Sequence, residues 1–123
     1  MAVKQKQRQI KEIIRCGQDP KYFFNKYIQI QHPIKGSVPF ATYGFQDECV
    51  QNFEEHRFNI ILKSRQLGLS TIAAGYSAWL AIFHKDKNIL VIATKLAVAQ
   101  NFIRKVKFII NSMPKWLLLP SIV

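Results

Sequence analysis

The segment Lys63–Thr71 constrains the fold of this 123-residue chain more than any other feature. It separates a short apolar run from a longer apolar pattern with helical spacing. The segment resembles the phosphate-binding pattern G-x-x-x-x-G-K-[ST], in which Gly68 and Ser70 hold their expected places. Lys63 stands where the first glycine belongs, and Leu69 where the lysine belongs. A strand, a loop and a helix in this order present backbone N–H groups and a helix N-terminus to an anion.

A phosphate loop needs a close backbone approach, a hydroxyl for Mg²⁺ and a cation for the phosphate oxygens. Gly68 allows the first, and Ser70 supplies the second. Leu69 carries no charge, so the cation has to come from another position, with Lys63 ahead of Arg65. The alternative is a plain strand-to-helix turn in which the hydroxyl of Ser70 or Thr71 caps the helix.

Composition favours one small intracellular domain with a polyanionic partner. Eighteen Lys and Arg against seven Asp and Glu give a formal charge of +11, which favours nucleic acid. Apolar residues make up 49% of the chain, which excludes a disordered tail. Cys16 and Cys49 lack a metal-binding pattern and are interpreted as reduced thiols. The longest apolar stretch, 72–83, is too short to span a bilayer, so we expect a soluble protein.

Apolar periodicity predicts an α/β fold. Strands at 58–62 and 89–93 and a helix at 72–83 together have the length of a right-handed βαβ unit. The expected fold class is an incomplete P-loop NTPase core, with one βαβ unit and N-terminal helices. Further helices are expected at 3–16, 20–27, 46–56 and 96–111, and an irregular connection at 32–39. Because two parallel strands leave both edges unpaired, the pattern also indicates a chain cut within a domain.

An aromatic–glutamine pair, Phe45 and Gln46, precedes the loop, with the glutamine eighteen positions before Ser64. With this spacing the chain resembles the large terminase subunits of tailed bacteriophages, the ATP-driven motors that pump DNA into preformed capsids. Those related to the contractile-tailed phages carry an S-R-Q-L-G-[KLM]-[ST]-T loop, which 64–71 matches. The segment 16–33 is similar to their N-terminal region, so the resemblance covers most of the chain.

The resemblance implies a role for each residue of the site. Gln46 would contact the adenine edge of ATP, and Phe45 would pack near the base. Ser70 would bind Mg²⁺, and Arg65 would act as the catalytic residue that stabilises the transferred phosphoryl group. Lys63 matches variant terminase loops that keep a lysine at the start. The implied nucleotide-binding residues are Phe45, Gln46, Lys63, Ser64, Arg65, Gln66, Leu67, Gly68, Leu69, Ser70 and Thr71.

The implied function is viral genome packaging in the cytoplasm of the host cell. The chain would be the ATP-binding N-terminal part of a large terminase that drives DNA translocation into the procapsid by ATP hydrolysis. Residues 1–36 would form an N-terminal helical segment, and 37–123 the first part of the P-loop ATPase domain. The implied partners are double-stranded DNA, the portal protein and the small terminase subunit, with no membrane.

Hydrolysis also needs an apolar strand that ends in Asp and Glu, to hold Mg²⁺ and orient the attacking water. None of the seven acidic residues follows an apolar run in this way. The sequence therefore lacks a Walker B carboxylate, a catalytic glutamate and the nuclease domain, and we expect the chain alone to be inactive as an ATPase. The alternatives are a fragment of a helicase-like nucleic-acid motor and a non-enzymatic, basic nucleic-acid-binding domain.

Overall fold

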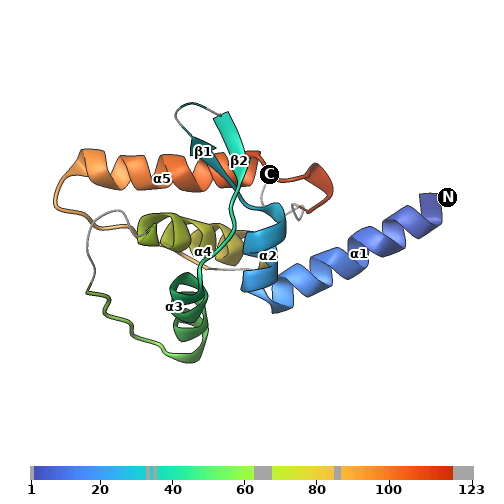
Figure 1. Cartoon of the computed structure of the whole chain (residues 1–123), viewed down its shortest axis with the longest axis horizontal. Coiled ribbons are helices and arrows are strands. Elements are labelled where there is room, and N and C mark those ends of the chain that lie inside the picture. Colours follow the sequence, from blue (N-terminus) through green and yellow to red (C-terminus); the bar gives the residue numbers. More distant parts are fainter. Residues whose placement is uncertain (1, 33, 35, 63–67, 85–86, 118–123) are drawn as a thin grey trace.

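The chain folds as helices packed around one central helix, α4 (Leu69–Phe83), in a computed structural model (Figure 1). The structure describes residues 2–32, 34, 36–62, 68–84 and 87–117. The other elements, in chain order, are α1 (Ala2–Gln18), α2 (Pro20–Tyr27), β1 (Gln29–His32), β2 (Gly36–Pro39), α3 (Gly44–Glu55), α5 (Leu96–Asn111) and the 3₁₀ helix η1 (Lys115–Leu117). In Figure 1, α4 lies between α3 and α5, α2 crosses near its end, and α1 extends away from the body.

Helix α4 occupies the centre because its sequence is apolar on nearly every side. A helix of this kind cannot keep one face in water, so it is covered by other elements. Helix α5 packs along it, and α2 and α3 contact it elsewhere. Its buried residues are Leu69, Ile72, Ala74, Gly75, Ala78, Trp79 and Ile82.

Gly75 sets how closely α2 approaches α4. A Cβ atom at this position would lie 2.9 Å from Cδ1 of Ile28 and 3.2 Å from the ring of Phe24. The Phe24 ring therefore occupies the space that any larger residue in α4 would fill. On the same helix, the indole N–H of Trp79 donates to the buried carbonyl of Cys16 at 2.7 Å. This hydrogen bond fixes the end of α1 to α4.

Helix α2 begins where the sequence predicts it. Asp19 is the N-cap residue, and its carboxylate accepts from the backbone N–H groups of Lys21 at 3.0 Å and Tyr22 at 3.4 Å. Pro20 occupies the first helical position, where its missing N–H costs nothing. The cap directs Phe23 into the core, where its ring meets the ring of Phe83 edge-on at 5.4 Å.

The far end of the described chain returns to the first helices. Leu117 in η1 is fully buried, and η1 contacts α1. The ring of Trp116 meets that of Tyr27 edge-on, with 5.9 Å between their centres. The core therefore contains side chains from both the first and the last described elements.

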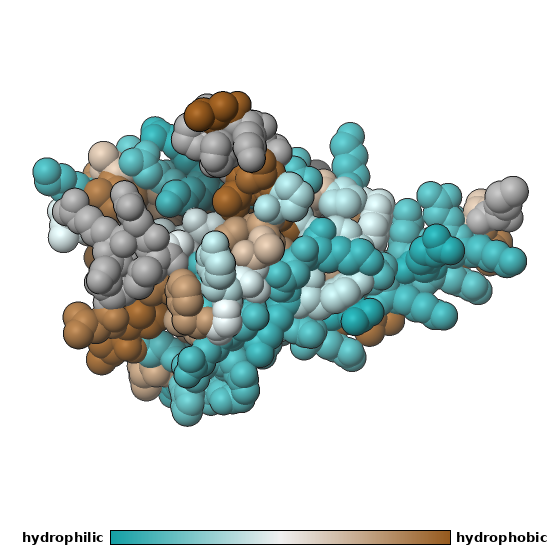
Figure 2. All heavy atoms as spheres, in the orientation of Figure 1, coloured by the Kyte–Doolittle hydropathy of each residue, from teal (hydrophilic) through white to brown (hydrophobic). Residues whose placement is uncertain are grey.

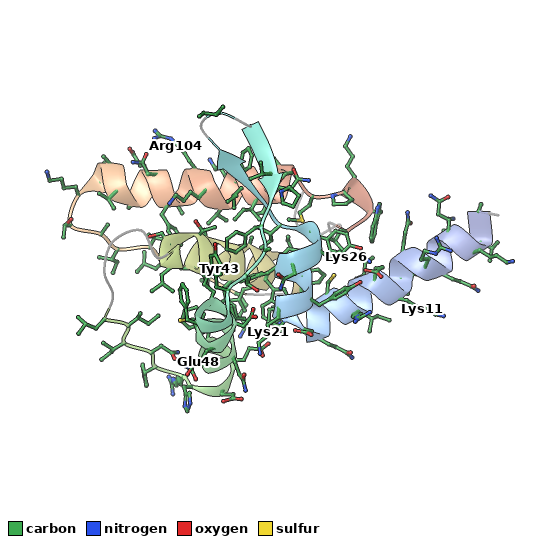
Figure 3. All side chains as sticks on the ribbon, viewed as in Figure 1. Lys11, Lys21, Lys26, Tyr43, Glu48 and Arg104 are labelled. Carbon is green, nitrogen blue, oxygen red and sulfur yellow. The ribbon has the colours of Figure 1, made fainter. Side chains whose placement is uncertain are left out.

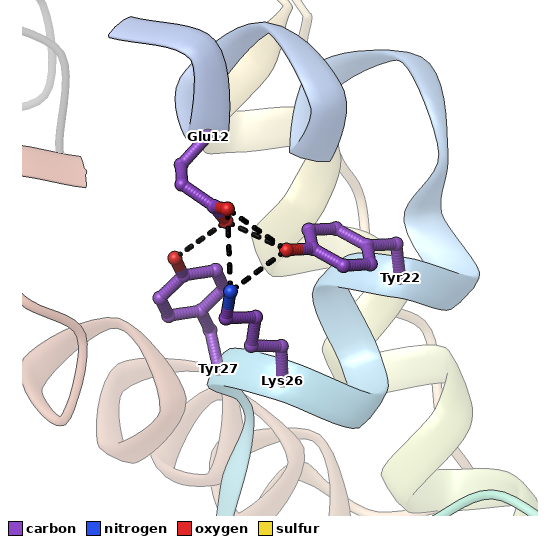
Figure 4. Close-up of polar contacts among 4 residues, drawn as sticks. All are labelled: Glu12, Tyr22, Lys26 and Tyr27. Carbon is purple, nitrogen blue, oxygen red and sulfur yellow. Dashed lines mark hydrogen bonds and ion pairs between the residues drawn. The ribbon is translucent and has the colours of Figure 1, made fainter. Parts of the chain in front are cut away.

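A polar cluster around Glu12 joins α1 to α2 (Figure 4). The Glu12 carboxylate accepts from the hydroxyls of Tyr22 (3.0 and 2.8 Å) and Tyr27 (2.8 Å), and Lys26 lies 3.2 Å from it. These contacts, led by the Tyr27 hydrogen bond, hold the pKa of Glu12 below its usual value, although burial opposes them. The ionised carboxylate is therefore the form that fastens the two helices.

The predicted α/β fold class, an incomplete P-loop NTPase core with one βαβ unit, is wrong. The described part contains one sheet, the antiparallel hairpin of β1 and β2, in which Ile30 pairs with Val38. This hairpin forms where we expected an irregular connection. The expected strands at 58–62 and 89–93 belong to no sheet.

The reason for the error is physical, because a strand is held by its neighbours and not by its own apolar character. Helix α5 packs directly on α4, so no sheet lies between them. Ile60 and Leu62 are 99% and 101% exposed, so these two side chains of the apolar run pack against none of the described residues. Figure 2 shows apolar surface where this segment runs in Figure 1. In the described part, no helix is both long enough and apolar enough to cross a membrane.

Replacement of Gly75 by valine should destabilise the fold by about 1–3 kcal/mol, because the added methyl groups overpack the contact with Phe24. Chemical denaturation followed by circular dichroism measures this difference. Ala81→Val, at a half-buried position of the same helix, measures the general cost of a valine in α4. Helix propensity alone would favour Gly75→Val, because valine is a better helix former than glycine. Equal losses at both positions would show that α2 can move away from α4 at little cost.

The Glu12 cluster should make stability depend on pH. Because the folded-state pKa of Glu12 lies below the ordinary value of 4.5, its contribution is present above that pH and is lost as the pH falls through the folded-state pKa. Glu12→Gln should cost about 1 kcal/mol near pH 7, and the difference from the parent should shrink below about pH 4.5. Urea denaturation at several pH values tests this, with Glu48→Gln, an exposed carboxylate on α3, as the control. A difference that stays constant with pH would contradict it.

Candidate functional site

The predicted adenine contact and the predicted phosphate loop meet in the structure. Gly68 is the N-cap residue of α4, and Gln46 lies in the first turn of α3. A Cβ atom on Gly68 would lie only 2.7 Å from Nε2 of Gln46, so the two residues are in direct contact. Gly68 also has a φ of 71°, in the left-handed region that favours glycine. Both the conformation and the contact therefore require glycine here.

Gln46 is buried, with 2% of its surface exposed, and its side chain is oriented by the backbone. Its amide oxygen accepts from the N–H of Tyr43 at 2.9 Å, at the start of α3. The amide nitrogen lies on the side of Gly68. The hydrogen bond to Tyr43 thus fixes which end of the amide points toward the beginning of α4.

Two exposed aromatic rings stand beside Gln46 in the sequence and stack on one another. The rings of Tyr43 and Phe45 are 6.0 Å apart and nearly parallel, with 7° between their planes. They are 69% and 45% exposed, so this flat surface is open to solvent. Sequence analysis singled out Phe45 and missed Tyr43, although an aromatic residue two positions earlier was a visible signal.

The structure places the second half of the predicted loop on the first turn of α4. Gly68 precedes the helix, and its carbonyl accepts from Ile72 N–H at 3.0 Å. Leu69 is buried, Ser70 is exposed and Thr71 is half-buried. The alternative in which Ser70 or Thr71 is the N-cap is wrong, because both residues lie inside α4 and Gly68 is the N-cap. The remaining predicted site residues, Lys63, Ser64, Arg65, Gln66 and Leu67, lie outside the described residues.

Leu69 cannot reach a ligand with its side chain, which packs into the interior. The first N–H groups of an α-helix have no carbonyl partner within the helix, so the start of α4 attracts anions through its backbone. Ser70 adds an exposed hydroxyl at the same turn. The described part of this site therefore offers backbone donors and a hydroxyl, but no cation.

A pocket of about 560 Å³ opens on the α5 side of this first turn. That volume falls within the range of small-molecule sites, roughly 300–1,000 Å³. Thr71 links the pocket to the start of α4, and Arg104 and Lys105 bring two positive charges from α5. Sequence analysis expected a helix at 96–111 but assigned no role to these two residues. The lining is completed by Gln29, Ile30, Asn101, Phe108 and Ile109.

Cys16 is a buried free thiol. Burial raises the pKa of the Cys16 thiol to about 12, so this cysteine is unreactive near neutral pH. The described residues contain no group of three or more His, Cys, Asp and Glu side chains placed to hold a metal ion.

No protein-family model matches the sequence. The resemblance to phage large terminases therefore stays a prediction from the loop and its distance from Gln46.

Gly68→Ala should destabilise the protein by about 1–2 kcal/mol from backbone strain, with a further loss from overlap with Gln46. The second part should disappear in a Gln46→Ala background, where the amide is absent. A double-mutant cycle of denaturation free energies separates the two contributions. If the free-energy losses of Gly68→Ala and Gln46→Ala add within about 0.5 kcal/mol, the two positions are not coupled.

Proposed function

We propose that the chain binds ATP where the starts of α3 and α4 meet, as the N-terminal part of a phage large terminase. The observation that carries the proposal is the contact between Gln46 and Gly68. Sequence resemblance assigned adenine to the first residue and the phosphate loop to the second. Their contact brings the two predicted halves of the nucleotide site together.

Each half of the nucleotide has suitable partners at this junction. The exposed stack of Tyr43 and Phe45 offers a flat aromatic surface for the base, beside the amide of Gln46. The start of α4 offers backbone donors to the phosphates. The hydroxyl of Ser70 suits Mg²⁺, which prefers oxygen ligands and enters such sites with the phosphates. When bound, Mg²⁺ neutralises phosphate charge.

In the complete motor, ATP hydrolysis would drive double-stranded DNA into the procapsid in the host cytoplasm. Arg65 would stabilise the transferred phosphoryl group, and Lys63 would contact the phosphates. The portal protein and the small terminase subunit would be the protein partners. Because the sequence lacks an apolar strand that ends in Asp and Glu, we propose that this chain binds ATP without turning it over.

A second candidate function, a non-enzymatic nucleic-acid-binding domain, is favoured by α1. Lys4, Arg8, Lys11 and Arg15 recur at helical spacing and are all exposed, which places four positive charges along one face. This face can contact the phosphates of a nucleic acid without reading its sequence. The guanidinium of Arg15 also lies over the ring of Tyr22, 3.9 Å from its centre.

Fluorescence titration with N-methylanthraniloyl derivatives of ATP and GTP tests the nucleotide site. We expect ATP to bind more tightly than GTP, because in the proposed site Gln46 would contact the adenine edge. Gln46→Ala should remove this preference, by about tenfold for one lost hydrogen bond. Gln51→Ala, an exposed glutamine on the same helix, should leave it unchanged.

Three outcomes would count against this proposal. Equal affinity of the parent for ATP and GTP would mean that Gln46 serves α3 alone. A preference for ATP that survives Gln46→Ala would place adenine elsewhere. Absence of nucleotide binding, together with binding of a labelled DNA duplex, would favour the second candidate function.

A further inference from the structure

The pocket between β1, the first turn of α4 and α5 is lined by basic side chains and by apolar ones. Arg104 and Lys105 are exposed on α5, and none of the eight described residues that line the pocket is acidic. Figure 3 shows Arg104 on α5, away from the crossing of α2 and α4. Ile30, Phe108 and the buried Ile109 supply apolar surface. A ligand that fits this lining carries negative charge.

The guanidinium of Arg104 has a defined orientation. One of its N–H groups donates to the side-chain oxygen of Asn101 at 2.7 Å, across one turn of α5. A guanidinium has five N–H donors in a planar fork, so this bond uses only one of them. Lys105 adds a mobile point charge at the adjacent position. The guanidinium can donate two parallel hydrogen bonds to phosphate oxygens, and the ammonium group of Lys105 can attract them as a point charge.

Thr71 makes this pocket relevant to the nucleotide site. It lies in the first turn of α4 and lines the pocket, while Gly68, one turn earlier, contacts Gln46. The start of α4 is therefore in contact with Gln46, the residue assigned to adenine, and also borders the basic pocket through Thr71. Thr71 belongs both to this helix start and to the lining of the pocket that contains Arg104 and Lys105.

We propose that Arg104 and Lys105 bind the phosphates of the nucleotide and supply positive charge that the loop lacks at Leu69. This inference rests on the proposed function, because it assigns the phosphate half of the same ligand to α5. It adds cations from α5, a helix that begins 25 residues after the loop ends at Thr71. No residue of the phosphate-loop pattern predicts it.

The experiment compares ATP with adenosine, which shares the base and lacks the phosphates. Isothermal titration calorimetry at constant ionic strength gives both affinities for the parent and for the double variant R104A/K105A. We expect ATP to bind more tightly than adenosine to the parent. The double variant should lose about tenfold or more of that ratio, while its adenosine affinity stays the same.

The control is K95A/K107A, which removes two exposed charges of the α5 region that do not line the pocket. It should keep the ATP-to-adenosine ratio of the parent, so that a loss in R104A/K105A cannot be a net-charge effect. Circular dichroism of all variants establishes that the helices are retained, which the exposure of the four side chains leads us to expect.

The possible failures are distinguishable. If the parent binds neither ATP nor adenosine, the proposed function fails and this inference fails with it. If the parent prefers ATP and R104A/K105A keeps the same ratio, only the assignment to α5 is overturned. If that variant loses affinity for labelled oligothymidylate alone, with the nucleotide ratio unchanged, the pocket binds a nucleic-acid strand and the assignment is also overturned.

Discussion

The close approach of α2 to α4 at Gly75 is the contact on which the rest of the structure depends. Because no side chain separates the helices there, the Phe24 ring lies directly on the α4 backbone. The apolar surface of α4 is then covered from several directions, by α2, α3 and α5. A helix enclosed in this way has little polar surface along its length, so its N-terminus is where it can interact with a ligand. Gly68 and Ser70 lie at that end.

The enclosure of α4 also explains why residues from distant parts of the sequence gather at its start. Helix α3 reaches this end through the contact of Gln46 with Gly68, and α5 reaches it through the pocket that includes Thr71. The first contact is neutral and oriented by a backbone hydrogen bond, whereas the second brings cations. This asymmetry matches a ligand with an uncharged planar part and an anionic part. The nucleotide proposed here has that distribution of charge.

The sequence predicted the helices well and the sheet poorly, for reasons that particular residues make clear. Apolar spacing and the Asp19–Pro20 signal located α2 and α5 with the bounds that the structure has, because helical hydrogen bonds are local. The apolar run at 58–62 predicted a strand, but a strand needs a partner that composition does not specify. The hairpin of β1 and β2 went unpredicted, although Gly36 adopts the positive φ of a turn residue. At the site, the pairing of Gln46 with the loop followed from resemblance, while Arg104 and Lys105 required tertiary structure.

The burial of Leu117 has a consequence for how the chain folds during synthesis. The core that closes around α4 contains Cys16 from the first helix and Leu117 from the last described one. Translation delivers the N-terminal helices first, but Leu117 can join the core around Cys16 only after residue 117 has left the ribosome. The contacts of the Glu12 cluster, by contrast, need no residue beyond Tyr27. The core around Cys16 is therefore completed late, when the last described helix becomes available.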